Sequence, residues 1–375
     1  MKNPRVSAWI PLFLILGFQS AFSQLTFPVR GAFYYSWYPA TWGVAGSHVF
    51  YQPDLGYYSS DDQAVVDQHI KALEYAKVDV AIASWWGINQ QSESKRFPAL
   101  FSRTIAAGSA LKWAIYYEKE GFGNPTVAQI QTDLAYVKQN YAGHPNYAHV
   151  DGKPVVFVYN ADDNTCEVAD RWAAATNGEW YVGLKVVGGY QGCAHQPSTW
   201  HQYGPNSPEQ RQTGYGIVIA PGFWRADATA PLLARDPVRF AQNVRDMVKS
   251  KEPWQLITTF NEWGEGTAVE SAKDWKSASG FGLYLDALHN DGNAVALADP
   301  QANRAGRNRL APAGETRMDV YDLKGKRIAT LKSESLEAFL ARTDKIGSAR
   351  GVYLARSAGG GSGSARDPVK LANLR

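Results

Sequence analysis

The chain has 375 residues, of which 45% are hydrophobic and 19% are charged, and its formal net charge is +3. This composition is ordinary for a globular protein, and no block of Lys and Arg residues alternates with aromatic residues, so we expect no nucleic-acid partner. The content of aromatic residues is high, with 13 Trp and 20 Tyr. Large cores hold such rings, and sugar-binding sites use them as stacking platforms.

Residues 1–23 have the features of a bacterial signal peptide. Lys2 and Arg5 precede an apolar run over residues 8–18, and Ala21-Phe22-Ser23 places small residues where a signal peptidase reads them. The run is shorter than the roughly 20 residues that span a bilayer. We therefore expect this leader to be removed and the protein to be secreted or displayed at the cell surface.

Residues 24–290 alternate strand-like runs with helical patterns, which is typical of a parallel α/β fold. Eight strands are the number that a (β/α)₈ TIM barrel needs, and the apolar character of several runs suits strands covered on both faces. We predict such a barrel for this segment. The expected strands cover residues 31–38, 79–86, 111–118, 154–159, 181–187, 199–203, 216–220 and 254–260.

Two helix starts can be predicted from capping patterns. Ser60, followed three residues later by Gln63, forms a capping-box pattern with Ser60 as N-cap. Asp236 precedes Pro237, which suits an N-cap residue followed by a first-turn proline. We expect one helix to begin after each pattern.

The sequence changes character after residue 290. Residues 291–315 are rich in Ala, Gly, Asn, Pro and Arg without periodicity and are predicted to be a linker. Residues 316–357 are expected to form a small C-terminal β module, and residues 358–375 a flexible tail. The strands expected in the module cover residues 318–323, 327–331 and 351–356.

This module resembles the C-terminal sorting or surface-attachment domains of some gliding and fibre-degrading bacteria. The resemblance rests on residues 320–325, VYDLKG, and on residues 351–354, GVYL. It implies contact with a secretion machinery or attachment to the cell surface. The alternative is a small accessory domain without a sorting role.

The two cysteines, Cys166 and Cys193, are expected in loops at the same end of the barrel. In an exported protein such a pair can form one disulfide, and the alternative is two unpaired thiols. His144 and His149 lie five residues apart in a loop, but no carboxylate at ligand spacing completes a metal site there. We expect no metal, no cofactor and a monomer.

The most informative stretch is residues 259–270, TFNEWGEGTAVE, at the end of the last expected strand. Catalytic groups of barrel enzymes lie at the carboxyl ends of the strands. Glu262 and Glu265 are three residues apart beside Trp263, and glycoside cleavage needs two such carboxyl groups. An apolar surrounding can raise the pKa of one of them. The alternative is a pair of surface acids, which is the usual reason for this spacing.

Aromatic residues also lie at or just after the ends of several other expected strands, beside polar partners. In a closed barrel these side chains would gather around one mouth, so we predict that they contact a sugar. The predicted contacts, with two from the informative stretch, are Tyr35, Trp37, Trp86, Tyr117, Glu118, Tyr203, Trp224, Asn261 and Trp263.

With these residues, the chain resembles glycoside hydrolase family 99, and the resemblance extends over roughly residues 30–270. The matching pieces are residues 31–35 with Trp37 and Tyr38, and residues 55–62, 84–87, 151–155 and 260–267. The resemblance implies an endo-α-1,2-mannosidase type of enzyme that retains the configuration at the cleaved carbon and uses no metal. Gly264 stands where the family has a histidine, so the resemblance does not extend to the choice of mannose.

The resemblance also implies a role for each glutamate. Glu262 matches the residue that takes a proton from the 2-hydroxyl of the substrate, which then attacks to give a 1,2-anhydro sugar. Glu265 matches the residue that protonates the leaving oxygen and later activates water. This differs from the usual scheme with an enzyme nucleophile.

We therefore predict a secreted glycoside hydrolase that acts within chains of α-mannan or a related polysaccharide. One alternative keeps the fold and chemistry with a different α-glycan as substrate. A second is a non-catalytic glycan-binding protein of the cell surface.

Overall fold

The computed structural model describes residues 24–43, 49–88, 91–160 and 165–293, with only the backbone at residues 91–95, and four short strands beyond residue 316. The chain divides into two compact units, Met1–Ala298 and Asp299–Arg375. The expected signal peptide and most of the expected linker lie outside the described residues. Among the helices of the described ranges, none has the length and apolar character of a membrane span.

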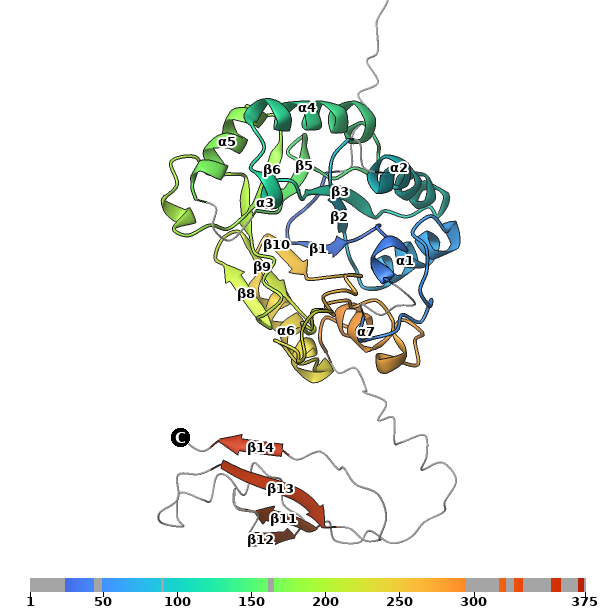
Figure 1. Cartoon of the computed structure of the whole chain (residues 1–375), viewed down its shortest axis with the longest axis vertical. Helices are drawn as coiled ribbons and strands as arrows, with labels where there is room; N and C mark the ends of the chain where they lie inside the picture. Colours follow the sequence, from blue (N-terminus) through green and yellow to red (C-terminus); the bar gives the residue numbers. More distant parts are fainter. Residues whose placement is uncertain are drawn as a thin grey trace, which may run out of the picture. The chain divides into compact units, whose positions relative to one another are not determined.

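The first unit is built on a ten-stranded sheet in which eight strands run parallel (Figure 1). Their order is β7-β6-β5-β3-β2-β1-β10-β9, and β7 and β9 at its two ends lie against each other, so the sheet curls into a barrel. The eight strands are β1 (Val29–Tyr34), β2 (Val80–Trp85), β3 (Lys112–Tyr117), β5 (Lys153–Val158), β6 (Tyr181–Lys185), β7 (Thr199–His201), β9 (Gly216–Ile219) and β10 (Trp254–Ile257).

The predicted α/β barrel and its eight strands are thus confirmed. Strand β1 lies between β2, the next strand in the sequence, and β10, the last one. Ala32 of β1 pairs with Ala81 of β2 on one side and with Ile257 of β10 on the other. Two short antiparallel strands, β4 (His149–Val150) and β8 (Glu209–Gln212), extend β5 and β9. Several strands end earlier than expected, so residues 35–38 and 258–260 already belong to loops at the barrel mouth.

Helices surround the strands (Figure 1). Two N-cap residues explain where helices begin. Asp236 caps the helix Pro237–Ser250, as predicted, because its side chain accepts hydrogen bonds from the backbone N–H groups of Val238 and Arg239. The predicted N-cap Ser60 is wrong, because Asp62 caps the first long helix and the Ser60 hydroxyl accepts a hydrogen bond from the Tyr38 N–H. The helices are α1 (Gln63–Tyr75), α2 (Gln91–Ala106), α3 (Glu120–Gly123), α4 (Val127–Val137), α5 (Glu167–Thr176), α6 (Pro237–Ser250) and α7 (Leu283–His289).

Large side chains fill the barrel interior. The Phe157 ring packs edge-on against the rings of Trp254 and His201, with centroid distances of 4.8 and 5.1 Å. Tyr116 contacts Phe33 at 4.7 Å. Burial, followed by the charge of Lys185, lowers the pKa of His201 to about 3, so that this interior ring is neutral. The barrel is therefore a packed core beneath its mouth.

Cys166, at the start of α5, forms a disulfide with Cys193, and their Cα atoms are 5.2 Å apart. The bond joins the loop after β5 to the loop after β6, both at the carboxyl end of the strands.

The second unit contains an antiparallel sheet in the order β12-β11-β13-β14. Strands β11 (Arg317–Tyr321), β12 (Arg327–Lys332) and β13 (Val352–Ala358) fall where three strands are expected. A fourth strand, β14 (Lys370–Asn373), pairs with β13 and lies within the segment predicted to be a tail.

The N-cap of α6 provides a test of this local structure. Replacing Asp236 by Ala removes the acceptor of two backbone N–H groups, and the free energy of unfolding should fall by about 1 kcal/mol. Asp236→Asn keeps an acceptor of equal capping strength and should stay close to the wild type. Urea unfolding of both variants measures the difference, and equal losses in the two would contradict the capping role.

Candidate active site

The loop after β10 folds back on itself and carries the two predicted catalytic residues. The Thr259 N–H donates to the Thr267 carbonyl at 3.0 Å, and the Val269 N–H donates to the Thr259 carbonyl at 3.0 Å. Glu262 and Glu265 lie in the turn between these contacts, at the carboxyl end of the barrel strands. We call residues 259–267 the catalytic loop, after the two residues in it that are predicted to be catalytic.

The carboxyl group of Glu262 is almost completely removed from water, with 6% of the residue exposed. Its Oε1 accepts a hydrogen bond from the Gly264 N–H at 3.0 Å, whereas its Oε2 is buried and has no hydrogen-bond partner among the described residues. Burial, then the charges of Glu265 and Glu118, raise the pKa of Glu262 well above its usual range. Oε2 is therefore an acceptor or donor available to a substrate hydroxyl.

Glu265 is partly buried and is held by a side chain from the loop after β7. Its Oε2 accepts a hydrogen bond from the Tyr203 hydroxyl at 2.8 Å, and that hydroxyl accepts one from Tyr35 at 3.1 Å. Burial raises the pKa of Glu265, while the Tyr203 hydrogen bond and the charge of Arg225 oppose the rise. The two glutamates thus form an interacting pair in which simultaneous ionisation of both carboxyl groups is disfavoured.

Several predicted sugar contacts lie around this pair. The Tyr35 ring packs against Trp37, with ring centroids 4.5 Å apart. The Trp224 N–H donates to the Glu265 carbonyl at 2.8 Å, which places Trp224 directly beside the catalytic loop. Glu118, 5% exposed, is close enough to raise the pKa of both Glu262 and Tyr35.

Trp86 lies farther along the rim. Its indole N–H donates to Ser84 at 3.1 Å, and its ring contacts the strongly exposed ring of Phe122 on α3 at 4.8 Å.

The prediction that Tyr117 contacts a sugar is wrong. Successive side chains of a strand point to opposite faces, so Tyr116 faces the barrel interior and Tyr117 faces the helix layer. The Tyr117 hydroxyl donates to Asp133 of α4 at 2.8 Å, and its ring packs edge-on against Trp172 of α5.

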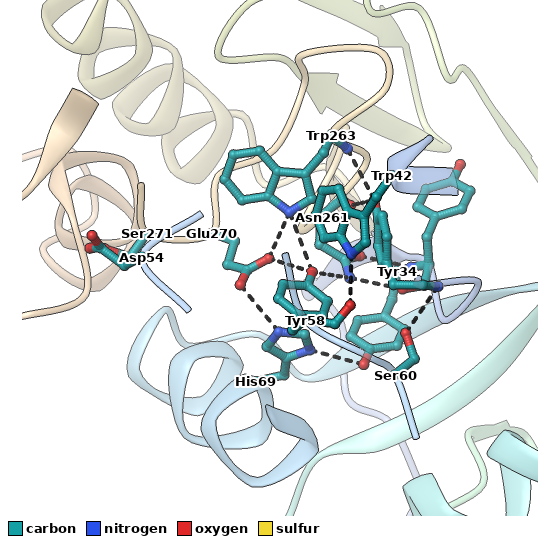
Figure 2. A network of polar contacts seen from close by, with 12 residues as sticks. Tyr34, Trp42, Asp54, Tyr58, Ser60, His69, Asn261, Trp263, Glu270 and Ser271 are labelled. Atoms are coloured by element: carbon teal, nitrogen blue, oxygen red, sulfur yellow. Dashed lines mark hydrogen bonds and ion pairs between the residues drawn. The ribbon is translucent and has the colours of Figure 1, made fainter. Parts of the chain in front are cut away.

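Asn261 and Trp263, also predicted to contact a sugar, are buried behind the catalytic loop instead, with 0% and 1% exposed. The Asn261 side chain accepts from the Tyr35 N–H and donates to the Tyr35 carbonyl, both at 2.8 Å. The Trp263 indole N–H donates to Glu270 at 3.0 Å (Figure 2). Both residues therefore hold the loop in place and do not face the barrel mouth.

Gly266 allows the catalytic loop to approach the segment that contains Trp224. Its φ of +61° is a conformation that other residues rarely adopt, and a Cβ atom there would lie 2.8 Å from the Trp224 carbonyl oxygen. Gly264 has an ordinary backbone conformation, and a Cβ atom there would lie 3.1 Å from Glu262 Oε1. The absence of a side chain at position 264 thus leaves the space beside Glu262 open.

No group of three or more His, Cys, Asp or Glu side chains in the described ranges could hold a metal ion. His144 stacks on Phe101 at 4.3 Å and the pKa of His149 is lowered by burial, so both histidines take part in the packing outside the barrel.

Comparisons with known proteins agree with this architecture. Residues 43–182 match the sequence model of glycosyl hydrolase family 99. A glycoprotein endo-alpha-1,2-mannosidase of Xenopus laevis is 24% identical over 61% of this chain and 60% of that protein. The corresponding protein of Rattus norvegicus is 21% identical over 63% and 59%. The chain therefore spans about three fifths of the length of these relatives.

A solved structure of a family 99 endo-alpha-mannosidase from Bacteroides thetaiotaomicron superposes with a TM-score of 0.56, at 20% identity, over 75% of this chain and 100% of that chain. The barrel is therefore a domain similar to those of glycosyl hydrolase family 99. The matched segment of the family model ends at residue 182, before the catalytic loop, so the roles of Glu262 and Glu265 depend on the geometry of the site.

Four residues of the family 99-like domain that hold the catalytic loop were not predicted from the sequence: Tyr38, Tyr58, His69 and Glu270. Tyr38, Tyr58 and Glu270 lie within the sequence stretches that resemble the family or surround the glutamates, but their residue type and spacing do not distinguish them from residues at the barrel mouth. His69 falls on the buried face of α1, where a histidine gives no separate signal.

Replacing Glu262 by Gln should stabilise the family 99-like domain at neutral pH. The unfolded chain ionises this carboxyl near its ordinary pKa of 4.5, whereas the folded chain holds the proton to higher pH. The wild-type free energy of unfolding should therefore fall as the pH rises above that value, and the variant should lack this loss. Thermal unfolding at pH 4 and pH 7.5 tests the prediction, which fails if the variant is no more stable than wild type at pH 7.5.

Proposed function

We propose that the chain is a secreted, retaining glycoside hydrolase that cleaves α-linked polysaccharide within the chain, with α-mannan or a related glycan as substrate. The observation that carries the proposal is the pair of buried, interacting carboxyl groups of Glu262 and Glu265 at the mouth of a family 99-like barrel. The names of the relatives, endo-alpha-1,2-mannosidases, support the substrate class.

In the proposed first step, Glu262 takes the proton of the substrate 2-hydroxyl, whose oxygen attacks the anomeric carbon. The bond from that carbon to the leaving oxygen breaks, and Glu265 donates its proton to the leaving oxygen. The product of this step is a 1,2-anhydro sugar. In the second step water opens the anhydro ring at the anomeric carbon, Glu265 takes a proton from the water, and Glu262 returns a proton to the 2-oxygen. Two inversions give net retention.

This mechanism requires Glu262 to be ionised and Glu265 to be protonated when substrate is bound. In the free protein the stronger upward pKa shift belongs to Glu262, while Tyr203 and Arg225 favour the ionised form of Glu265. A substrate 2-hydroxyl that donates to Glu262 would favour its ionised form, and a leaving oxygen that accepts from Glu265 would favour its protonated form. We therefore propose that substrate binding moves the shared proton to Glu265.

The remaining rim residues would bind sugar rings. Tyr35, Trp37 and Trp224 lie next to the carboxyl pair and are proposed to contact the sugars that flank the cleaved bond. Trp86 is proposed to stack on a sugar ring of the glycan, and Tyr203 is proposed to bind the glycan through its hydroxyl. We propose that the protein is a monomer that requires no cofactor, and that its C-terminal module takes part in secretion or surface attachment.

A non-catalytic glycan-binding protein is the second candidate. A binder gains nothing from two adjacent buried carboxyl groups, because holding them out of water raises the free energy of the folded state unless they are protonated. Glu262 Oε2 is buried without a hydrogen-bond partner among the described residues, which also raises the free energy of the folded state and so favours the enzyme over the binding protein.

The carboxyl pair can be tested directly. Glu262→Gln and Glu265→Gln each remove the proton transfer but keep the shape of the side chain, and kcat should fall by about 10²–10⁴-fold for release of oligosaccharides from α-mannan. Glu252→Gln is a matched control, because Glu252 is a buried carboxyl that accepts from Arg211 and from the Gly214 N–H, outside the catalytic loop. Full activity in either catalytic variant contradicts the roles, and binding without cleavage by the wild type on any α-glycan favours the second candidate.

The hydrogen bond from Tyr203 makes a prediction about pH. Tyr203→Phe removes a donor that stabilises the ionised form of Glu265, so the pKa of Glu265 should rise. The profile of kcat/KM against pH should shift to higher pH, because the pair then loses its protons at higher pH. Initial rates across the pH range measure the shift, and an unshifted profile would show that the hydrogen bond does not act on the reacting group.

A further inference from the structure

The informative stretch contains a third carboxylate, Glu270, which the proposed chemistry does not use. It is 3% exposed and faces the back of the catalytic loop (Figure 2). Its Oε2 accepts hydrogen bonds from the Tyr58 hydroxyl at 2.8 Å and from the Trp263 indole N–H at 3.0 Å, and its Oε1 lies 3.2 Å from His69 Nε2. Glu270 thus gathers three hydrogen-bonding groups from three separate parts of the chain.

His69 extends this arrangement to the barrel wall. Its ring is 1% exposed on α1, and its Nδ1 lies 3.0 Å from the hydroxyl of Tyr34 on β1. Burial raises the pKa of Tyr34 and of Tyr58 well above the usual range, so both hydroxyls keep their protons. In the tautomer whose Nε2 donates to Glu270, Nδ1 can accept from the Tyr34 hydroxyl, so both ring nitrogens are then hydrogen-bonded.

The network holds the residues on both sides of Glu262. On one side, the Trp263 indole is fixed by Glu270, and its ring stacks on Trp275 at 5.9 Å. On the other side, the Asn261 amide donates to the Tyr58 hydroxyl at 3.3 Å and forms two hydrogen bonds with the backbone of Tyr35.

The backbone on either side of Glu262 has a common partner as well. The Tyr38 hydroxyl donates to the Asn261 carbonyl at 2.6 Å and accepts from the Trp263 N–H at 3.2 Å. Glu262 is thus placed by contacts to its two neighbours in sequence.

We propose that Glu270 and His69 are positioning residues for the catalytic loop, an inference that rests on the proposed function. They act through Trp263 and Tyr58, which set the backbone from which Glu262 reaches the substrate. A displacement of about 1 Å in a reacting group can lower a rate by about 10²-fold, so loss of the network should lower kcat. The sugar-contacting rim is left in place, and KM should change little.

A cavity of about 60 Å³ lies directly beside His69 and Glu270, lined also by Gln68, Ala72 and Ser271. It adjoins the space that an imidazole ring would leave in a His69→Ala variant. A site that combines this room with polar partners can hold a small polar molecule. Added imidazole should therefore bind in the variant, donate to Glu270 and accept from Tyr34 as the native ring does.

The alternative is that the network only stabilises the fold. In that case Glu270→Ala would lower the thermal midpoint, while the molecules that remain folded would keep their kcat. Glu252→Gln serves again as the control for loss of a buried carboxylate elsewhere in the barrel. Comparing kcat per folded molecule, and not total activity, separates the two cases.

The experiment measures kcat and KM on α-mannan for Glu270→Ala, Glu270→Gln, His69→Ala and Glu252→Gln, each checked for folding by circular dichroism. We expect kcat to fall by about 10²-fold in the two Ala variants with KM nearly unchanged. Glu270→Gln should recover much of this loss, because its amide can still accept from Trp263 and Tyr58 and can donate to the other tautomer of His69.

Imidazole is then added to each variant. It should raise kcat in His69→Ala and leave Glu270→Ala unchanged. The proposal is overturned if folded Glu270→Ala keeps the kcat of Glu252→Gln, or if neither imidazole nor the Gln substitution restores any activity.

Failure of the proposed function gives a different result. If the wild type cleaves no α-glycan, the chemistry assigned to Glu262 and Glu265 is wrong, and the network is tested by amide hydrogen exchange instead. Faster exchange confined to residues 259–267 in both Ala variants, and absent in Glu252→Gln, supports the positioning role. Unchanged exchange in that segment overturns it.

Discussion

Two carboxyl groups that lie close together and away from water set the main physical constraint on this barrel. Ionising both would leave two like charges in a poorly solvated place, and the free energy of this state is high. Burial raises the pKa of both groups, and the charge of Glu265 raises that of Glu262 further, so contacts of the surrounding residues must hold the pair in place. The hydroxyl of Tyr203, the N–H of Gly264 and the buried network behind the loop supply these contacts.

The barrel strands could be predicted because their burial on both faces produces nearly continuous apolar runs, as in residues 80–85 and 254–257. The position of the candidate pair, Glu262 and Glu265, at the barrel mouth could be predicted because a strand end, two carboxyl groups and the resemblance to a family motif coincide at residues 260–267. The direction of side chains at the strand ends was harder to predict. Tyr116 and Tyr117 are the same residue type, and only the register of β3 decides which of them faces the interior.

The supporting residues could not be predicted for a different reason. Trp263 and Asn261 stand beside Glu262 in sequence, yet their side chains point to the back of the loop, where they bind Glu270 and Tyr58. Tyr58, and the His69 that contacts Glu270, lie about 200 residues earlier, and no local pattern predicts such contacts. Only the position of β1 between β2 and β10 brings these segments together.

The long separation of these partners affects when activity can arise during synthesis. The Asn261 side chain is bound to the backbone of Tyr35 across 226 residues of chain, and both residues belong to the same site. The part of the chain that is made first contains Tyr35, Tyr58 and His69, but it carries neither Glu262 nor Glu265. The site is therefore complete only once β10 has joined β1, so closure of the barrel is the step that assembles it.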